Sequence, residues 1–258
     1  MPADEHRAKN PVGAIYKATR VVAAIKEHDG AGITELAEKL DMTKSGVHNY
    51  LSTLEDEGFV KQNETSKQYR VGLRFLEFAE YARKQHRIYR IAQPEIRDLA
   101  EETGERAHLM IEEAGKGVVV QEEEGSQAVN IVGELGSRVP LHCTAGGKII
   151  LSYLPEARRE RILDRHGLPR YTRHTITERE ELHAELERVR EDVGIEREEY
   201  VRGIGAIGAP ILDEQDDIIA AISISGPVGR IEDDAKTDEL TEIVRTTSNI
   251  IGITYMNS

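Results

Sequence analysis

The sequence has one cysteine and no long apolar run, and its positive charge is outweighed by negative charge. Because Cys143 is alone, no disulfide can form within the chain and no CxxC metal or redox pair exists. No apolar stretch approaches the roughly 18 residues that a membrane-spanning helix needs. The first nine residues are polar and lack the apolar segment of a secretory signal peptide. We therefore expect a cytoplasmic protein without membrane contact.

The formal net charge of -13 argues against a nucleic-acid partner, because DNA affinity depends largely on Lys and Arg facing phosphates. The charge is unevenly distributed, however. Residues 1–90 hold 15 Lys and Arg against 13 Asp and Glu, a net of +2, which leaves -15 for residues 91–258. The first part can thus meet a polyanion. A strongly acidic surface is also typical of proteins from a salt-rich cytoplasm, as in halophiles.

Apolar spacing at the start of the chain predicts three short helices. The first spans 12–28 and ends before Gly30 and Gly32. Thr34 is the expected N-cap of the second helix, and Thr43 that of the third. The third helix places Val47, Leu51 and Leu54 on one side, and on the other side it leaves polar residues free: Lys44, Ser45, His48, Asn49 and Ser52.

Two short strands, at 59–62 and 68–71, follow the third helix and are joined by a polar stretch. Three helices and a hairpin within about 60 residues are typical of a winged helix-turn-helix, whose recognition helix enters the major groove. Further on, the pattern predicts strands at 108–113, 118–123, 204–212 and 218–225, and helices at 88–102, 145–154, 178–191 and 234–255. The chain is therefore expected to be an α+β protein, and its length favours two domains.

Particular segments resemble the IclR family of transcriptional regulators. In the N-terminal part these are GITELA (32–37), TKSGVH (43–48) and LSTLEDEGFV (51–60). Further along the chain they are PLHCTAGGK (140–148), 203–213 and AAISISGP (220–227), so the resemblance covers nearly the whole chain. It implies a second domain with a GAF-like fold, a central antiparallel sheet and a small-molecule effector. The acidity favours a haloarchaeal member of the family.

The expected domains are a DNA-binding domain at 1–72, a linker and dimerisation helix at 73–90, and an effector-binding domain at 91–258. The linker carries Leu73, Leu76, Ala79 and Ala82 at helical spacing, with Phe75 and Phe78 beside them. These extra aromatic residues indicate a second buried face. Contact with a second protomer and packing on its own domain both explain them.

The predicted DNA-contacting residues lie on the third helix and on the hairpin. Lys44 and Ser45 suit phosphates, whereas His48 and Asn49 suit base edges, since an Asn amide pairs with adenine through two hydrogen bonds. Thr43 belongs to the same segment. Lys67, Gln68 and Arg70 on the hairpin are candidates for backbone contacts. The alternatives are a solvated helix face, hairpin residues that serve solubility, and an Arg70 that braces the hairpin.

Three segments partly match motifs of enzyme sites, but their surroundings in the sequence disfavour catalysis. Residues 203–208 satisfy GxGxxG, but Pro210 and a continuing apolar run predict a strand rather than a turn entering a helix. Gly147-Lys148 lacks the flanking residues of a phosphate-binding loop. Neighbours such as His142 and Cys143 usually point apart, which disfavours a nucleophile and base. No catalytic residue, metal ligand or cofactor is predicted.

The family resemblance implies an effector pocket formed by Ala145 and Gly146 at a helix start, Glu196, and two strands. The strand residues are Ile204, Ala206, Ser223 and Ser225, and Ala128 and Ile131 close the pocket. Amide groups at a helix N-terminus attract a carboxylate or phosphate. An organic or sugar acid is thus the expected effector class. Ordinary packing around small residues is the alternative.

Together these observations predict a regulator that binds double-stranded operator DNA as a homodimer or a dimer of dimers, and that responds to a small effector. An architectural DNA-binding protein without effector response and a small-molecule enzyme are the alternatives. The sequence leaves open the effector, the operator and target genes, the choice between repression and activation, and the choice between dimer and tetramer.

Overall fold

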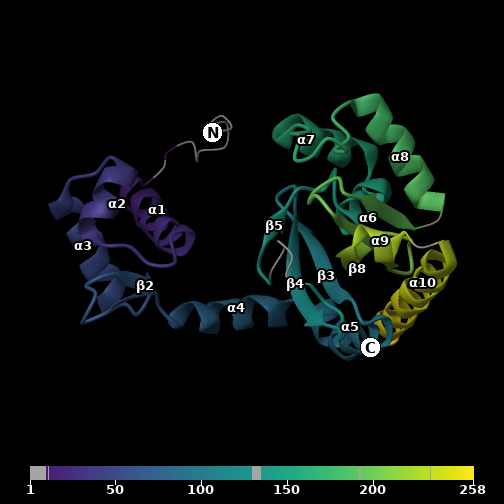
Figure 1. The fold of residues 1–258 in the computed structure, drawn as a ribbon, viewed down its shortest axis with the longest axis horizontal. Coiled ribbons are helices and arrows are strands. Elements are labelled where there is room, and N and C mark those ends of the chain that lie inside the picture. Colours follow the sequence, from purple (N-terminus) through teal and green to yellow (C-terminus); the bar gives the residue numbers. More distant parts are fainter. Residues whose placement is uncertain (1–9, 11, 130–134, 192, 233) are drawn as a thin grey trace. The chain divides into compact units, whose positions relative to one another are not determined.

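The computed structural model describes residues 10, 12–129, 135–191, 193–232 and 234–258. The chain separates into two units, Met1–Arg83 and Lys84–Ser258, whose helices and strands are labelled in Figure 1. Each unit has a hydrophobic core of its own. In the described part of the chain, no helix combines the length and the apolar character needed to cross a membrane.

The first unit begins with three helices packed around one core. They are α1 (Gly13–Glu27), α2 (Ile33–Leu40) and α3 (Lys44–Asp56). Of the apolar positions that predicted these helices, Ile25, Leu36, Val47 and Leu51 are buried in the core, whereas Ile15 on the first helix is 63% exposed. Thr43 caps α3 as predicted, because its hydroxyl accepts the Gly46 N–H at 3.1 Å. The helix-turn-helix part of the fold is confirmed.

A hairpin of β1 (Val60–Gln62) and β2 (Tyr69–Val71) completes this unit. Tyr69 also exchanges backbone hydrogen bonds with Ala31, at 3.1 and 2.9 Å, so the hairpin is fastened to the connection between α1 and α2. The predicted N-cap of the second helix was wrong. α2 begins at Ile33 with Gly32 as its cap, because the Gly32 carbonyl accepts the N–H of Leu36, whose side chain is fully buried.

The linker region 73–90 was predicted as one helix overlapping a second at 88–102, but the boundary between the two helices lies earlier than predicted. α4 (Arg74–Gln85) ends at His86, which is extended, and α5 (Arg87–Thr103) starts immediately after it. Ile88 and Tyr89, in the first turn of α5, are buried in the second unit. The break therefore lies where the apolar face of α5 begins to pack.

A six-stranded antiparallel sheet forms the centre of the second unit, with strand order β5-β4-β3-β8-β7-β6. The strands are β3 (Arg106–Glu113), β4 (Lys116–Glu124), β5 (Arg138–Val139), β6 (Gly194–Arg197), β7 (Ile204–Leu212) and β8 (Ile218–Pro227). The helices are α5, α6 (Ala145–Tyr153), α7 (Glu156–His166), α8 (Arg179–Glu191), α9 (Val228–Ile231) and α10 (Asp234–Met256). The α+β class with a central antiparallel sheet is confirmed.

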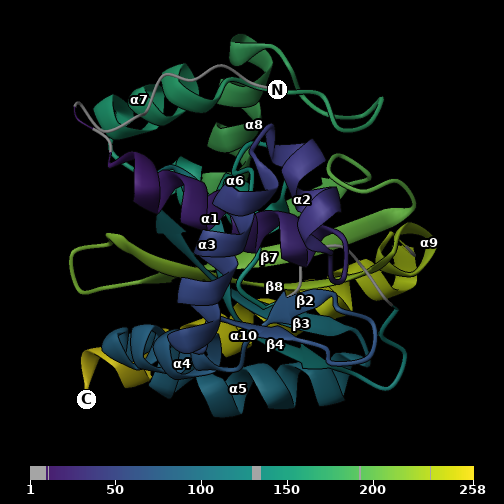
Figure 2. The ribbon, with the colours of Figure 1, turned by 90° about the vertical axis from the view of Figure 1, so that its left-hand side faces the viewer.

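Helices cover both faces of this sheet. Figure 2 shows α5 and α10 on one side and α6, α7 and α8 on the other. Successive strand residues point to opposite faces, so Leu109 and Ile222 join the core beneath α5, whereas Met110 and Ala221 join the core with α6. The sequence pattern missed the short strands β5 and β6 and the helices α7 and α9.

In the glycine-rich segment 203–208, residues 204–208 belong to a strand, as the sequence predicted, whereas Gly203 lies in the preceding turn with a φ of +80°. β7 covers the predicted range 204–212 and pairs with β6 and β8 on its two sides. Its Gly208 lets the start of α6 approach, since a Cβ there would lie 3.3 Å from the Gly146 nitrogen. The motif thus permits close packing of a helix on the sheet rather than binding of a dinucleotide.

Gly194 is a second contact point between the sheet and α6. A Cβ at this position would lie 2.9 Å from both the Ala145 carbonyl oxygen and Ile149 Cγ1. We expect Gly194→Ala to displace α6 and to cost about 1–3 kcal/mol in the free energy of unfolding, measured with urea. Gly229→Ala is the matched control because its Cβ would meet nothing within 4 Å. Equal stability of the two variants would contradict the close approach.

Candidate functional site

Polar residues occupy the sheet face that α6 covers. In one row across the sheet, Glu196 pairs with Ala206, Ala206 with Ser225, and Ser225 with Arg106. In the next row Ser223 lies opposite His108. The register therefore brings together side chains from four strands that are distant in sequence. An apolar face would be expected under a buried helix, so this polar strip is the candidate binding site of the second unit.

The strip opens into a cavity with about 530 Å³ of empty space, part of it open to solvent. Seven of the nine residues predicted to bind an effector line it: Ala145, Gly146, Glu196, Ile204, Ala206, Ser223 and Ser225. The remaining lining residues are His108, Met110, Val119, Val139, Thr144, Tyr200 and Val201. We call this cavity the sheet pocket.

Two predicted residues are not part of this arrangement. Ala128 is half-buried in the turn after β4, where its N–H donates to Gly125, and it is not among the lining residues. Ile131 lies outside the described residues. The effector-binding role of the whole set stays a prediction, but the structure gathers most of it around one cavity.

The first turn of α6 forms one wall of the sheet pocket. Its N-cap residue, Thr144, makes no side-chain capping bond, because the Thr144 hydroxyl donates to the Pro140 carbonyl at 2.9 Å. The amide groups at the start of the helix are thus left without a capping side chain beside Ala145 and Gly146. Such amides carry partial positive charge and favour an anion.

Glu196 forms the opposite wall and is 4% exposed. Its Oε1 accepts the N–H groups of Glu199 and Tyr200, the latter at 3.1 Å. Burial raises the pKa of this carboxyl to about 7; the two backbone N–H groups and the Lys148 ammonium oppose the rise, whereas the Glu199 charge adds to it. At neutral pH this carboxyl is thus close to half-protonated.

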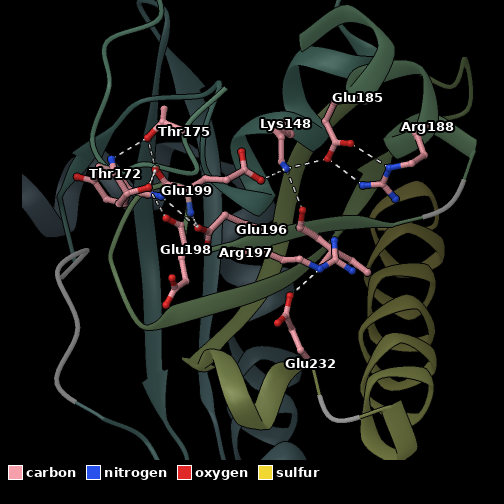
Figure 3. Close-up of polar contacts among 12 residues, drawn as sticks. Lys148, Thr172, Thr175, Glu185, Arg188, Glu196, Arg197, Glu198, Glu199 and Glu232 are labelled. Carbon is pink, nitrogen blue, oxygen red and sulfur yellow. Dashed lines mark hydrogen bonds and ion pairs between the residues drawn. The ribbon is translucent and has the colours of Figure 1, made fainter. Parts of the chain in front are cut away.

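Lys148 lies behind Glu196 with none of its surface exposed. Figure 3 shows its ammonium between two carboxylates, Glu185 of α8 at 2.8 Å and Glu199 at 2.5 Å, and it also donates to the Ile195 carbonyl at 2.9 Å. All three N–H donors are therefore used. Burial raises the pKa of Glu199, and Lys148 opposes this. We call these groups the Lys148 cluster.

In the sequence, Lys148 stands out only as part of an incomplete phosphate-binding motif, Gly147-Lys148. Its carboxylate partners lie 37 and 51 residues further along the chain. No short motif carries that information, and only the tertiary fold brings the three side chains together. His108 was missed for a similar reason, since its place beside Ser223 depends on strand register.

His108 is the second titratable group in the sheet pocket. Burial, followed by the positive charge of Arg106, lowers the pKa of His108 to about 4, so its ring is neutral at pH 7. Arg106 itself donates to Glu122 and, at 2.6 Å, to Glu124 on β4. Among the described residues that line the pocket there is no Lys or Arg.

The predicted DNA-contacting residues are all exposed. Thr43, Lys44, Ser45, His48 and Asn49 lie at the start and on the solvent face of α3. Lys67, Gln68 and Arg70 lie on the hairpin and are equally exposed, and the Arg70 side chain runs beside Gly30. The structure therefore presents them on two surfaces of one unit, as a winged helix-turn-helix requires.

The remaining candidates for chemistry are buried or dispersed. Cys143 is fully buried, and burial raises the pKa of its thiol above the ordinary range. The neighbouring His142 ring instead contacts the Pro169 carbonyl at 3.1 Å. Within the described ranges, no group of three or more His, Cys, Asp or Glu side chains is arranged to hold a metal ion.

Comparison with known proteins assigns both units. Residues 14–64 match the IclR helix-turn-helix domain, and residues 80–252 match the bacterial transcriptional regulator IclR C-terminal domain. A probable HTH-type transcriptional regulator, ArcR, of Halobacterium salinarum is 33% identical over 246 residues, which cover 94% of this chain and 93% of the relative.

Solved structures of two regulators are similar to this chain as well. The Thermotoga maritima IclR crystal structure is 30% identical, with a TM-score of 0.77 over 94% of this chain and 96% of that chain. The inducer-binding domain of a PobR transcription factor double mutant from Acinetobacter, in complex with 3-hydroxybenzoic acid, is 28% identical. It covers 63% of this chain and 96% of that chain, with a TM-score of 0.58.

The raised pKa of Glu196 predicts a specific pH dependence of stability. The pKa of Glu196 is higher in the folded protein than its value of 4.5 in the unfolded chain. Its contribution to the free energy of unfolding is therefore fully present below pH 4.5 and is lost as the pH rises towards 7. The rise corresponds to about 3 kcal/mol. The free energy of urea unfolding should therefore fall between pH 4.5 and 7.5 more for the unmodified protein than for Glu196→Gln. Identical pH profiles, with Glu214→Gln at an exposed turn as control, would contradict the assignment.

Removal of the buried ammonium should destabilise the second unit. Lys148→Met leaves Glu185 and Glu199 without their shared cation, and breaking such a pair typically costs about 3–5 kcal/mol. Arg188→Met is the matched control, because Arg188 pairs with the same Glu185 at 2.8 Å but its side chain is 47% exposed. Its loss should cost less than about 1 kcal/mol. Urea unfolding measures both, and equal losses would show that burial of the pair is unimportant.

Proposed function

This chain belongs to the IclR family of transcriptional regulators, and we propose that it binds a partly palindromic operator as a dimer, or as two dimers, under the control of a small acidic effector. The proposed domains are the DNA-binding domain at 1–72, the linker at 73–90 and the effector-binding domain at 91–258. The observation that carries the proposal is the sheet pocket, which combines an uncapped helix start with buried polar side chains in the same chain as an exposed recognition helix.

The geometry of α3 supports specific DNA recognition. Val47 and Leu51 are fully buried and fix the helix against its own unit, so the opposite face is held rigidly outward. Ser45, His48 and Asn49 lie on that outward face. Lys44 at the helix start supplies a positive charge for a phosphate, and Asn49 has the amide that suits adenine.

The related PobR domain supports an acid as the effector class. Its structure holds 3-hydroxybenzoic acid. In this chain the start of α6 offers amides to a carboxylate, and Ser223 and Ser225 add hydroxyl groups on the facing strand. The effector of this chain need not be an aromatic acid, since an organic or sugar acid satisfies the same groups.

Exposed apolar side chains on α4 support self-association. Phe75 and Phe78 pack on Phe59 of their own unit. The ring centroid of Phe59 lies 5.1 Å from that of Phe75 and 5.7 Å from that of Phe78. Leu76 and Tyr81 remain 66% and 68% exposed. Both explanations of the linker aromatics thus have support, and a second protomer is the proposed cover for the exposed side.

We further propose that the chain is not an enzyme and acts in the cytoplasm, where its DNA lies. The buried, protonated thiol of Cys143 is a poor nucleophile, and the His142 ring is engaged with a backbone carbonyl rather than with that thiol. Whether binding represses or activates depends on where the operator lies relative to its promoter.

The proposal is tested by protection of DNA upstream of the protein's own and neighbouring genes, with excess nonspecific competitor, over a salt series and with a panel of acids. Protection of a discrete site that one acid strengthens or abolishes is expected. Equal, weak binding to every fragment, unaffected by metabolites, would favour an architectural DNA-binding protein instead.

Two substitutions on α3 should have different effects on DNA binding. Asn49→Ala removes a base contact and should weaken operator binding by about 10- to 100-fold while relaxing specificity at one position. Lys44→Ala removes a phosphate contact, so it should weaken binding to all sequences and reduce the salt slope by about 1. Binding isotherms measure both effects. Lys236→Ala on α10 is the charge-matched control, and an Asn49 variant that behaves like it would contradict the assignment.

A further inference from the structure

The sheet pocket holds two features that point to an anionic ligand group. The first is the start of α6, whose amides have no capping side chain. The second is Ser225, which is 8% exposed, lines the pocket, and has an Oγ without a hydrogen-bond partner among the described residues. A buried hydroxyl left unpaired costs about 1–3 kcal/mol, so a ligand oxygen that pairs with it gains that energy. A carboxylate fits both groups.

A carboxylate in this cavity would lie in the same space as Glu196, whose side chain forms no ion pair with a cation in the described part of the chain. The nearest ammonium, that of Lys148, already donates to Glu185, Glu199 and the Ile195 carbonyl. Lining residues within the described part of the chain include no Lys or Arg. Two buried carboxylates close together cannot both stay ionised at low energetic cost, and one shared proton removes the conflict.

We propose that the effector is a small weak acid whose carboxyl group shares one proton with Glu196, so that effector binding takes up a proton near neutral pH. This inference rests on the proposed function. The proton comes from solvent. When Glu196 is ionised, a monoanionic ligand and one proton enter together, and the net charge of the pocket stays unchanged. When Glu196 is already protonated, the anion enters alone.

Several ionisable groups surround Glu196. From the 198–203 loop, Glu199 and Tyr200 face it through their N–H groups; burial raises the pKa of Glu199 as well, and its ion pair with Lys148 of α6 opposes that rise. Glu185 of α8 is shared between Lys148 and Arg188, and these two cations help to lower its pKa. The other ionisable groups nearby are His108 and Arg106 of β3 and the protonated Cys143.

The pKa of about 7 for Glu196 agrees with this geometry and sets the expected size of the effect. If only the protonated form binds a carboxylate, the dissociation constant should rise about 30-fold between pH 6 and pH 8.5. Glu196→Gln keeps a hydrogen-bond donor but cannot lose a proton. The dissociation constant of the acid from the Glu196→Gln variant should therefore stay constant between pH 6 and pH 8.5. At pH 8.5 this variant should bind the acid more tightly than the unmodified protein does.

The experiment uses isothermal titration calorimetry of the full-length chain with pyruvate, gluconate and 3-hydroxybenzoate, and with the amide of each acid. Titrations at pH 8 in phosphate and in Tris, which differ in protonation enthalpy, give the number of protons taken up. We expect about one proton per bound acid, none for Glu196→Gln, and unchanged uptake for the exposed control Glu214→Gln. Acid binding that is independent of pH, or binding of the amides alone, would overturn the inference.

Infrared difference spectra between the unmodified protein and Glu196→Gln give a readout that needs no ligand. A protonated-carboxyl band present at pH 6, lost at pH 8.5 and absent from the variant is expected. Without that band the inference fails even if an acid binds. Failure of the proposed function is separate, because it is a failure to protect a discrete DNA site, whatever the state of Glu196.

Discussion

The ion pairs of Lys148 are the interaction on which the sheet pocket depends. An ammonium with no exposed surface is costly unless every one of its protons is bound, and here the three partners come from α8, from β6 and from the loop after it. Since Lys148 belongs to α6, this single side chain holds together the helix that supplies the uncapped amides and the strand that supplies Glu196. A change in position of one wall would break a buried ion pair, so the walls are expected to move together or not at all.

The Lys148 cluster gives the neighbouring carboxyls Glu196 and Glu199 different hydrogen-bond partners. Glu199 and Glu196 are three residues apart and both are buried, but only Glu199 contacts the ammonium. Glu196 receives two backbone N–H groups, which stabilise its ionised form without supplying a full charge. Burial raises the pKa of both carboxyls, to about 7 at Glu196, and at Glu199 the ion pair with Lys148 opposes the rise. Glu199 thus has a cation as its partner, whereas Glu196 lines the sheet pocket with backbone N–H groups as its partners.

Local patterns in the sequence predicted what depends on local structure. The free face of α3, its Thr43 cap and the full extent of β7 followed from side-chain periodicity, because helix and strand periods are fixed by backbone geometry. The family resemblance then placed seven residues around one cavity. The partners of Lys148 could not be predicted, because they lie far away in sequence and meet only through sheet register and helix packing. The break at His86 was missed because both α4 and α5 are amphipathic, and only the buried contacts of Ile88 show where one ends.

The two units differ in where their polar groups lie, and they differ in net charge as well. The first unit presents polar side chains on a rigid helix, and its charges nearly balance, with 12 Lys and Arg against 13 Asp and Glu in residues 1–83, so it repels a polyanion little. The second unit encloses its polar groups and carries the net charge of -15 at 91–258, which discourages nonspecific contact with DNA phosphates. A repulsive second unit leaves DNA affinity to the first unit alone, so effector control of DNA binding has to act through that unit.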